Sequence, residues 1–171
     1  MSAAALVVCI GNELVADDGV GWVVYKRLQG IGLAENVRLV FLGLGGIDLL
    51  EEIDGEALLV VVDGVQLGAS PGTVHQLGWQ QLPASPARPV SGHGIGIREA
   101  ISVGQKLYPE RVPKEIFLVG IEGKCFNELG VGLTDAVALA VPQAVSAVLS
   151  LIQAYVKAPI KGVDTFTENF L

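Results

Sequence analysis

The stretch "AALVVCIGNELVADDGVGW", residues Ala4 to Trp22, decides which class of fold the chain adopts. Ala4 to Ile10 is a continuous aliphatic run without polar alternation, which is typical of a strand buried on both faces of a parallel sheet. After a glycine-flanked acidic loop, aliphatic residues recur at helical spacing from Gly19 to Leu28. A buried strand followed by a helix is the repeating unit of an α/β fold.

The same alternation continues along the chain, which predicts a doubly wound α/β sheet. We expect one domain over residues 1–156, built as a three-layer, twisted, mostly parallel sheet with helices on both faces. A polar tail at 157–171 is expected to be loosely ordered. Further strands are predicted at Val37–Leu42, Ala57–Val62, Thr73–Leu77 (a short edge strand or hairpin arm) and Glu115–Val119, and further helices at Ile47–Ile53, within Ser91–Leu107 and at Thr134–Tyr155.

The composition excludes several classes of protein. The chain has 171 residues, of which 51% are hydrophobic and 17% charged, and a net charge of −7, so it can bury a sizeable core. No basic stretch is long enough to bind along a phosphate backbone, which argues against nucleic acid as a partner. Cys9 and Cys125 lack Cys-x-x-Cys spacing, which indicates a reducing, cytoplasmic location. The apolar stretch Ala136 to Ile152 contains Pro142 and is expected to be too short and too broken for membrane insertion.

Polar residues stand where the predicted strands end, and ligands of such sheets bind beyond the carboxyl ends of strands. Asp63 follows the aliphatic run Leu58–Val62, and it either ties down its loop or belongs to a site; the residues alone favour neither reading. Asp17 and Asp18 precede a helix, and one carboxylate is enough to cap it. We assign the cap to Asp17 and leave Asp18 available as a ligand.

The chain has two histidines, and they fall in different surroundings. His75 lies in an alternating segment and is interpreted as a surface strand residue, whereas His93 lies between glycines in "SGHGIG". Two carboxylates from Asp18 and Asp63 with the imidazole of His93 would suit a divalent ion such as nickel or zinc. No His-x-x-x-His pair is present, which excludes a zincin, and "GLGGID" from Gly43 lacks the third glycine of a dinucleotide fingerprint.

Four blocks of sequence, in order, resemble the [NiFe]-hydrogenase maturation endopeptidases: "GNELVADDGVG", "LLVVVDGVQLGASPGT", "SGHGIGIREAI" and "IFLVGIEGKCFNELGVGLTDAV". The resemblance covers about Ala4 to Tyr155. It implies an endopeptidase of the aspartic type that removes the C-terminal extension of a hydrogenase large-subunit precursor after nickel insertion. It also implies that Asp18, Asp63 and His93 bind nickel supplied by the precursor, and that Asp18 or Asp63 orients the attacking water.

One segment departs from the family pattern. An Asp-Gly-Gly-Thr-like stretch is common after the second strand, whereas this chain reads Phe41-Leu42-Gly43-Leu44. Gly43, Gly45 and Gly46 are expected to form a flexible loop that meets the substrate. Two alternatives stay open from the sequence: a non-catalytic nickel-binding or assembly factor for the same precursor, and an ordinary metallopeptidase with its own metal.

Overall fold

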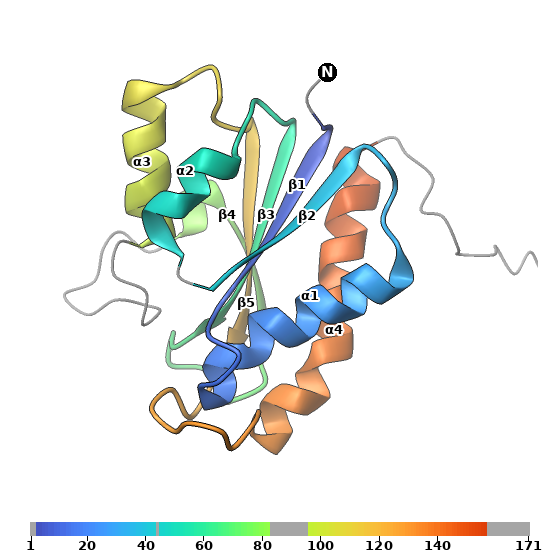
Figure 1. The fold of residues 1–171 in the computed structure, drawn as a ribbon, viewed down its shortest axis with the longest axis vertical. Helices are drawn as coiled ribbons and strands as arrows, with labels where there is room; N and C mark the ends of the chain where they lie inside the picture. The colour runs from blue at the N-terminus through green and yellow to red at the C-terminus, as the bar shows by residue number, and fades with distance from the viewer. Residues whose placement is uncertain (1–2, 44, 83–95, 157–171) are drawn as a thin grey trace, which may run out of the picture.

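The computed structural model describes residues 3–43, 45–82 and 96–156, and it contains one five-stranded sheet in the order β2-β1-β3-β5-β4 (Figure 1). Four of the strands run parallel, and β4 pairs antiparallel with β5 at one edge. The predicted α/β, mostly parallel sheet is therefore confirmed. The strands are β1 (Ala5–Ile10), β2 (Val37–Leu42), β3 (Leu58–Val65), β4 (Val74–Gly78) and β5 (Glu115–Glu122).

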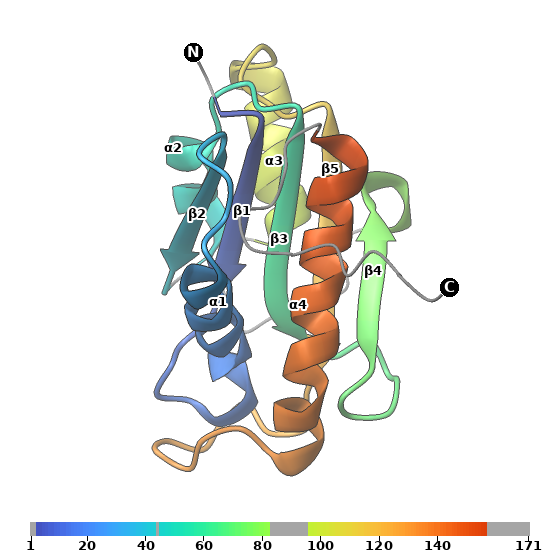
Figure 2. The ribbon, with the colours of Figure 1, turned by 90° about the vertical axis from the view of Figure 1, so that its right-hand side faces the viewer.

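Helices cover both faces of the sheet and make three layers. Figure 2 shows α1 and α4 in front of the strands and α2 and α3 behind them. The aliphatic strands β1 and β3 are buried along their whole length, because alternate side chains pack into one helical layer or the other. The helices are α1 (Val20–Ile31), α2 (Leu49–Glu52), α3 (Ile97–Leu107) and α4 (Asp135–Tyr155), with short 3-10 helices η1 (Ala16–Gly19), η2 (Gly46–Asp48) and η3 (Trp79–Gln81).

The strands β3 and β5 each run three residues further than the sequence predicts. The parallel ladder between them continues from Asp63↔Gly120 to Val65↔Glu122. Asp63 therefore lies inside a strand and not after its end. The polar residue suggested the end of β3 in the sequence, but the partner strand extends equally far and keeps the backbone hydrogen bonds of both strands satisfied.

The expectation about the late apolar stretch is wrong in one respect. α4 is one helix of 21 residues, and an 18-residue window in it has a mean hydropathy of 1.8, so it is long and apolar enough to cross a membrane by length and composition. Pro142 lies inside this helix and does not end it. Core helices pass the same test, and in this fold α4 buries one side in the hydrophobic cluster that covers the sheet.

Candidate active site

Asp18 lies in η1, directly after the loop that follows β1. Its side chain is buried, and Oδ2 accepts a hydrogen bond from the backbone N–H of Asn12 at 2.9 Å. Gly11 has φ +146, and a Cβ there would stand 2.0 Å from the carbonyl oxygen of Asp18. Only glycine fits this close approach. The glycine after β1 therefore lets the chain fold back and bring the Asp18 carboxylate to the end of the strand.

The backbone next to Asp18 is strained. Ala16 has φ 32, and it is the only non-glycine residue with positive φ in the part of the chain that the structure describes. Such a conformation costs an alanine on the order of 1 kcal/mol. Neighbouring contacts hold it, because Val15 forms a β-bridge with Leu129 and the N–H of Asp17 donates to the carbonyl of Cys125 at 2.9 Å.

Asp17 does not cap α1, and the predicted role of this residue was wrong. The N-cap residue of α1 is Gly19, and no side chain caps that helix. The fully buried Asp17 carboxylate instead accepts hydrogen bonds from the N–H groups of Lys124 and Cys125 and from both the N–H and the hydroxyl of Thr134. Asp17 therefore fastens the β5–α4 loop and the start of α4 to the loop after β1.

These contacts also set the acidity of Asp17. Burial by itself raises the pKa of a carboxyl group. The hydrogen bonds from the backbone N–H groups and from the Thr134 hydroxyl outweigh burial, so the pKa of Asp17 is lowered from its ordinary value of 3.8. Asp17 is therefore a charged structural anchor, and its carboxylate is fully engaged away from any ligand.

Asp63 lies in β3 beside the end of β1, and it is 1% exposed. The next residue, Gly64, packs so closely on η1 that a Cβ there would stand 3.0 Å from the carbonyl oxygen of Asp17. The segments that carry Asp63 and Asp18 are thus in backbone contact. Two of the three predicted ligands thus lie in neighbouring segments, Asp18 after the end of β1 and Asp63 inside β3 beside that end.

Cys9 is a buried neighbour of Asp63 and is not a candidate nucleophile. Burial raises the pKa of the Cys9 thiol, and the negative charge of Asp63 raises it further. A thiol is nucleophilic only as the thiolate, which this site opposes.

His93 lies outside the described residues, as does the tail 157–171. Within the described ranges no three His, Cys, Asp or Glu side chains come together as a metal site. The predicted ligand set of Asp18, Asp63 and His93 therefore stays a prediction.

The glycines expected to meet the substrate lie directly after β2, at the same end of the strands as the Asp18 loop. Gly43 is exposed, Gly45 is half-buried, and Gly46 is buried with φ 83 at the start of η2. Because β2 is parallel to β1, this segment leaves the sheet at the end where the Asp18 loop begins.

The sequence reasoning missed Glu122, at the end of β5. Its buried carboxylate accepts hydrogen bonds from the N–H groups of Leu67 and Gly68, at 2.9 and 3.0 Å, and lies 2.9 Å from Nε2 of His75. His75 does lie on the edge strand β4, but its side chain is only 18% exposed, so it is not a plain surface residue. A carboxylate that directly follows an apolar strand, as in "IFLVGIEG", was the available signal.

The comparisons with known proteins agree with this arrangement. The family model described as hydrogenase maturation protease matches residues 23–151, so the chain belongs to the hydrogenase maturation proteases and is a hydrolase. The matched range includes Asp63 and His93 but begins after Asp18.

Individual relatives and solved structures cover most of the chain. The hydrogenase expression/formation protein HupD of Rhodobacter capsulatus is 30% identical over 159 residues, 92% of this chain and 75% of HupD. The hydrogenase 2 maturation protease of Escherichia coli is 27% identical over 150 residues, 86% of this chain and 90% of that protein.

Two solved structures share the fold. The hydrogenase maturating endopeptidase HybD from E. coli has a TM-score of 0.78 at 26% identity, covering 90% of this chain and 93% of its own. HybD from Thermococcus kodakarensis, a [NiFe] hydrogenase maturation protease, has a TM-score of 0.69 at 26% identity, covering 88% and 99%.

Proposed function

We propose that this chain removes the C-terminal extension of a [NiFe]-hydrogenase large-subunit precursor in the cytoplasm, after nickel has been inserted into that precursor. In this proposal Asp18, Asp63 and His93 recognise the nickel that the precursor carries. The nickel is part of the substrate and reports that insertion is complete.

The observation that carries the proposal is the burial of two carboxylates in neighbouring segments, Asp18 after the end of β1 and Asp63 inside β3 beside that end. Asp18 is 7% exposed and Asp63 is 1% exposed, and their segments are in backbone contact. Placing two carboxylates in a region of low dielectric constant costs free energy, which a cation offsets. Carboxylate oxygens and an imidazole are suitable ligands for nickel.

In this proposal the chain's own residues position the substrate and activate a water. Binding the precursor's nickel fixes the position of the scissile peptide. The carboxylate of Asp18 or Asp63 then orients a water toward the peptide carbonyl, accepts a proton from it, and returns that proton to the amine that leaves when the peptide C–N bond breaks. In the predicted substrate loop of Gly43, Gly45 and Gly46, the exposed Gly43 and half-buried Gly45 offer bare backbone at the same end of the strands, where an extended peptide can approach closely.

The proposal is tested by incubating the purified protein with nickel-loaded and nickel-free large-subunit precursor and measuring product masses. We expect loss of a C-terminal peptide from the nickel-loaded precursor alone. Cleavage of both precursors at equal rates would rule out nickel recognition. If neither is cut although the matched precursor is used, the proposal of C-terminal processing is wrong.

Single-residue variants test which residues belong to the proposed site. Asp63→Asn and His93→Ala should each lower the processing rate by at least about a hundredfold, because each removes a ligand or the group that orients water. Asp54→Asn is the matched control, because Asp54 is exposed and precedes β3, at the opposite end of the strands. Normal processing by the Asp63 or His93 variant would remove that residue from the site.

A further inference from the structure

The sheet has a free edge at β2. In the strand order β2 is terminal, and among the described residues it pairs with β1 alone. Figure 1 shows β2 in front of the sheet between α1 and α2, and Figure 2 shows it from the side at the margin of the sheet. A strand with one unpaired side can accept another extended chain.

The backbone groups that face outward on β2 can be identified from the ladder. The carbonyls of Asn36 and Leu42 accept hydrogen bonds from the β1 side, from Ala5 N–H at 3.3 Å and Gly11 N–H at 3.2 Å. Successive residues of a strand direct their N–H and C=O groups to alternate sides. The even-numbered residues of β2 therefore face β1. Leu39 and Phe41 each present a donor and an acceptor to the free edge, whereas the N–H of Val37 donates to the carbonyl of Ala34 at 2.9 Å.

This edge lacks the features that usually prevent pairing with other chains. The six residues of β2 contain no proline and no lysine. Arg38 is its one charged residue, and that guanidinium is held by Glu52 at 2.7 Å and Glu56 at 3.1 Å. The edge is thus apolar and without a free charge, so it is complementary to an extended segment that is itself uncharged.

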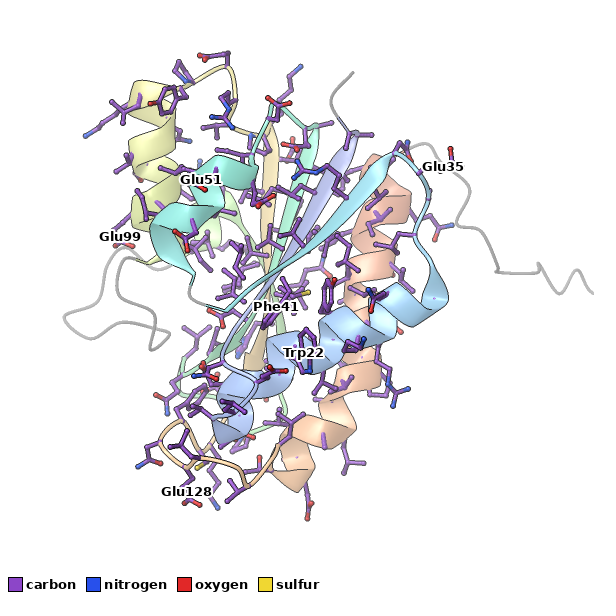
Figure 3. All side chains as sticks on the ribbon, in the orientation of Figure 1. Trp22, Glu35, Phe41, Glu51, Glu99 and Glu128 are labelled. Atoms are coloured by element: carbon purple, nitrogen blue, oxygen red, sulfur yellow. The ribbon has the colours of Figure 1, made fainter. Side chains whose placement is uncertain are left out.

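Aromatic side chains line the α1 side of the edge. The half-buried rings of Trp22, Tyr25 and Phe41 contact one another, with the Trp22 and Phe41 centroids 4.9 Å apart in an edge-to-face arrangement. Figure 3 shows Trp22 on α1 directly below Phe41 on β2. Partly exposed aromatic clusters of this kind are typical of peptide-binding surfaces.

The edge leads to the candidate active site. The carbonyl of Leu42, the last residue of β2, accepts the N–H of Gly11, and the N–H of the following Asn12 donates to the Asp18 carboxylate. A chain that pairs parallel or antiparallel with the outer side of β2 would therefore leave the sheet at the end where the Asp18 loop begins, with β2 between it and β1.

We propose that the free edge of β2 binds an extended, uncharged segment of the substrate polypeptide as a sixth strand, and that this pairing delivers the scissile peptide to Asp18. The inference rests on the proposed function, because a protease that cuts near a chain end needs a linear segment at its site. The continuity of the edge with the Asp18 loop favours the substrate over a second copy of the chain as the occupant.

The sharpest variant is Leu39→Pro, which removes an outward N–H without touching the β1–β2 ladder. Leu39→Ala is its reference, because it loses the same side chain and keeps the N–H. With nickel-loaded precursor as substrate, we expect KM for Leu39→Pro at least tenfold above that for Leu39→Ala, with a smaller change in kcat. Circular dichroism and the unfolding midpoint of both variants confirm that the comparison is between folded proteins.

A measurement on the unaltered protein keeps the inference testable if Leu39→Pro does not fold. Residue-resolved amide exchange is recorded with and without a synthetic peptide that spans the precursor's cleavage region. We expect the amides of Leu39 and Phe41 to exchange rapidly in the free protein and to be slowed when the peptide is added.

Each outcome decides the question. Equal KM values for the two variants, or unchanged exchange at Leu39 and Phe41, would overturn the inference. Slow exchange at these amides in the free protein, together with a dimer in light scattering, would show that a second copy occupies the edge and would overturn it as well. If the wild-type protein leaves the precursor uncut, the proposed function falls, and amide protection by the peptide alone decides the strand inference.

Discussion

The adjacent aspartates Asp17 and Asp18, which follow β1, have different roles. The Asp17 carboxylate accepts hydrogen bonds from four donor groups in the β5–α4 loop and Thr134, whereas the Asp18 carboxylate accepts one from the N–H of Asn12 after the end of β1. A single-residue step turns one side chain toward the body of the protein and the next toward the strand ends. The structural anchor and the candidate ligand are therefore neighbours in sequence.

Removing the charge of Asp17 should lower stability more than it alters chemistry. In Asp17→Asn the amide NH₂ faces backbone donors in place of an acceptor oxygen, so we expect a loss of about 3 kcal/mol in the free energy of unfolding. Denaturant titration measures it. Asp48→Asn, an exposed acid on η2, is the control and should change stability by less than about 0.5 kcal/mol. A loss as small as that of the control would contradict the anchoring role.

The same residue predicts a pH dependence with a definite sign. The pKa of Asp17 is lowered in the folded state, so its contribution is fully present above the unfolded value of 3.8 and is lost as pH falls through the folded pKa. The stability difference between wild type and Asp17→Asn should be constant from about pH 5 to 7 and should shrink below about pH 4. A difference that grew on acidification would show that another group is responsible.

At the scale of elements, the extension of β3 and β5 places a further buried acid, Glu122, beside the candidate site. Glu122 fixes the loop after β3 through the N–H groups of Leu67 and Gly68 and contacts His75 on β4. The Glu122 carboxylate therefore links β5, the loop after β3 and strand β4. This arrangement stiffens the backbone that follows Asp63.

Glu122→Gln should loosen that loop. The amide retains one acceptor oxygen and turns an NH₂ toward backbone donors, so we expect faster amide exchange at Leu67 and Gly68 and a loss of about 2 kcal/mol in stability. Glu115→Gln is the matched control, because Glu115 is exposed at the other end of the same strand. Unchanged exchange at both amides in the Glu122 variant would mean that the loop is held by other contacts.

At the scale of the whole molecule, α4 is the largest helix of the α1 layer and supplies much of the core on that face. Its composition alone would also suit a membrane, so packing decides its role. The residues that face the sheet are buried, while Leu139 on the opposite side is 81% exposed.

Two leucines of α4 test this assignment within one helix. Leu151→Ala should cost about 3 kcal/mol, because Leu151 is 3% exposed in the core cluster and its loss leaves a cavity. Leu139→Ala removes the same atoms from the surface and should cost less than about 0.5 kcal/mol. Unfolding midpoints of the two variants measure the contrast. Equal losses would show that Leu139 is covered in solution.

The unbroken aliphatic runs predicted the central strands and the α/β class, because a strand that is buried on both faces needs an apolar side chain at nearly every position. Val37–Leu42 was predicted with the bounds that the structure shows. Strand ends were less predictable. A polar residue ends an apolar run in sequence, but the ladder between β3 and β5 continues through Asp63 as long as both partners extend.

The class of fold and the family resemblance, both confirmed above, could be predicted from the amino-acid sequence, which also indicated the candidate acids. These depend on local patterning and on motifs that are contiguous along the chain. Only the tertiary structure decided that Asp17 anchors a loop more than 100 residues away, that Glu122 and His75 meet, and that β2 ends beside Asp18. Such contacts join residues far apart in sequence, and their partners are set by how strands align in space.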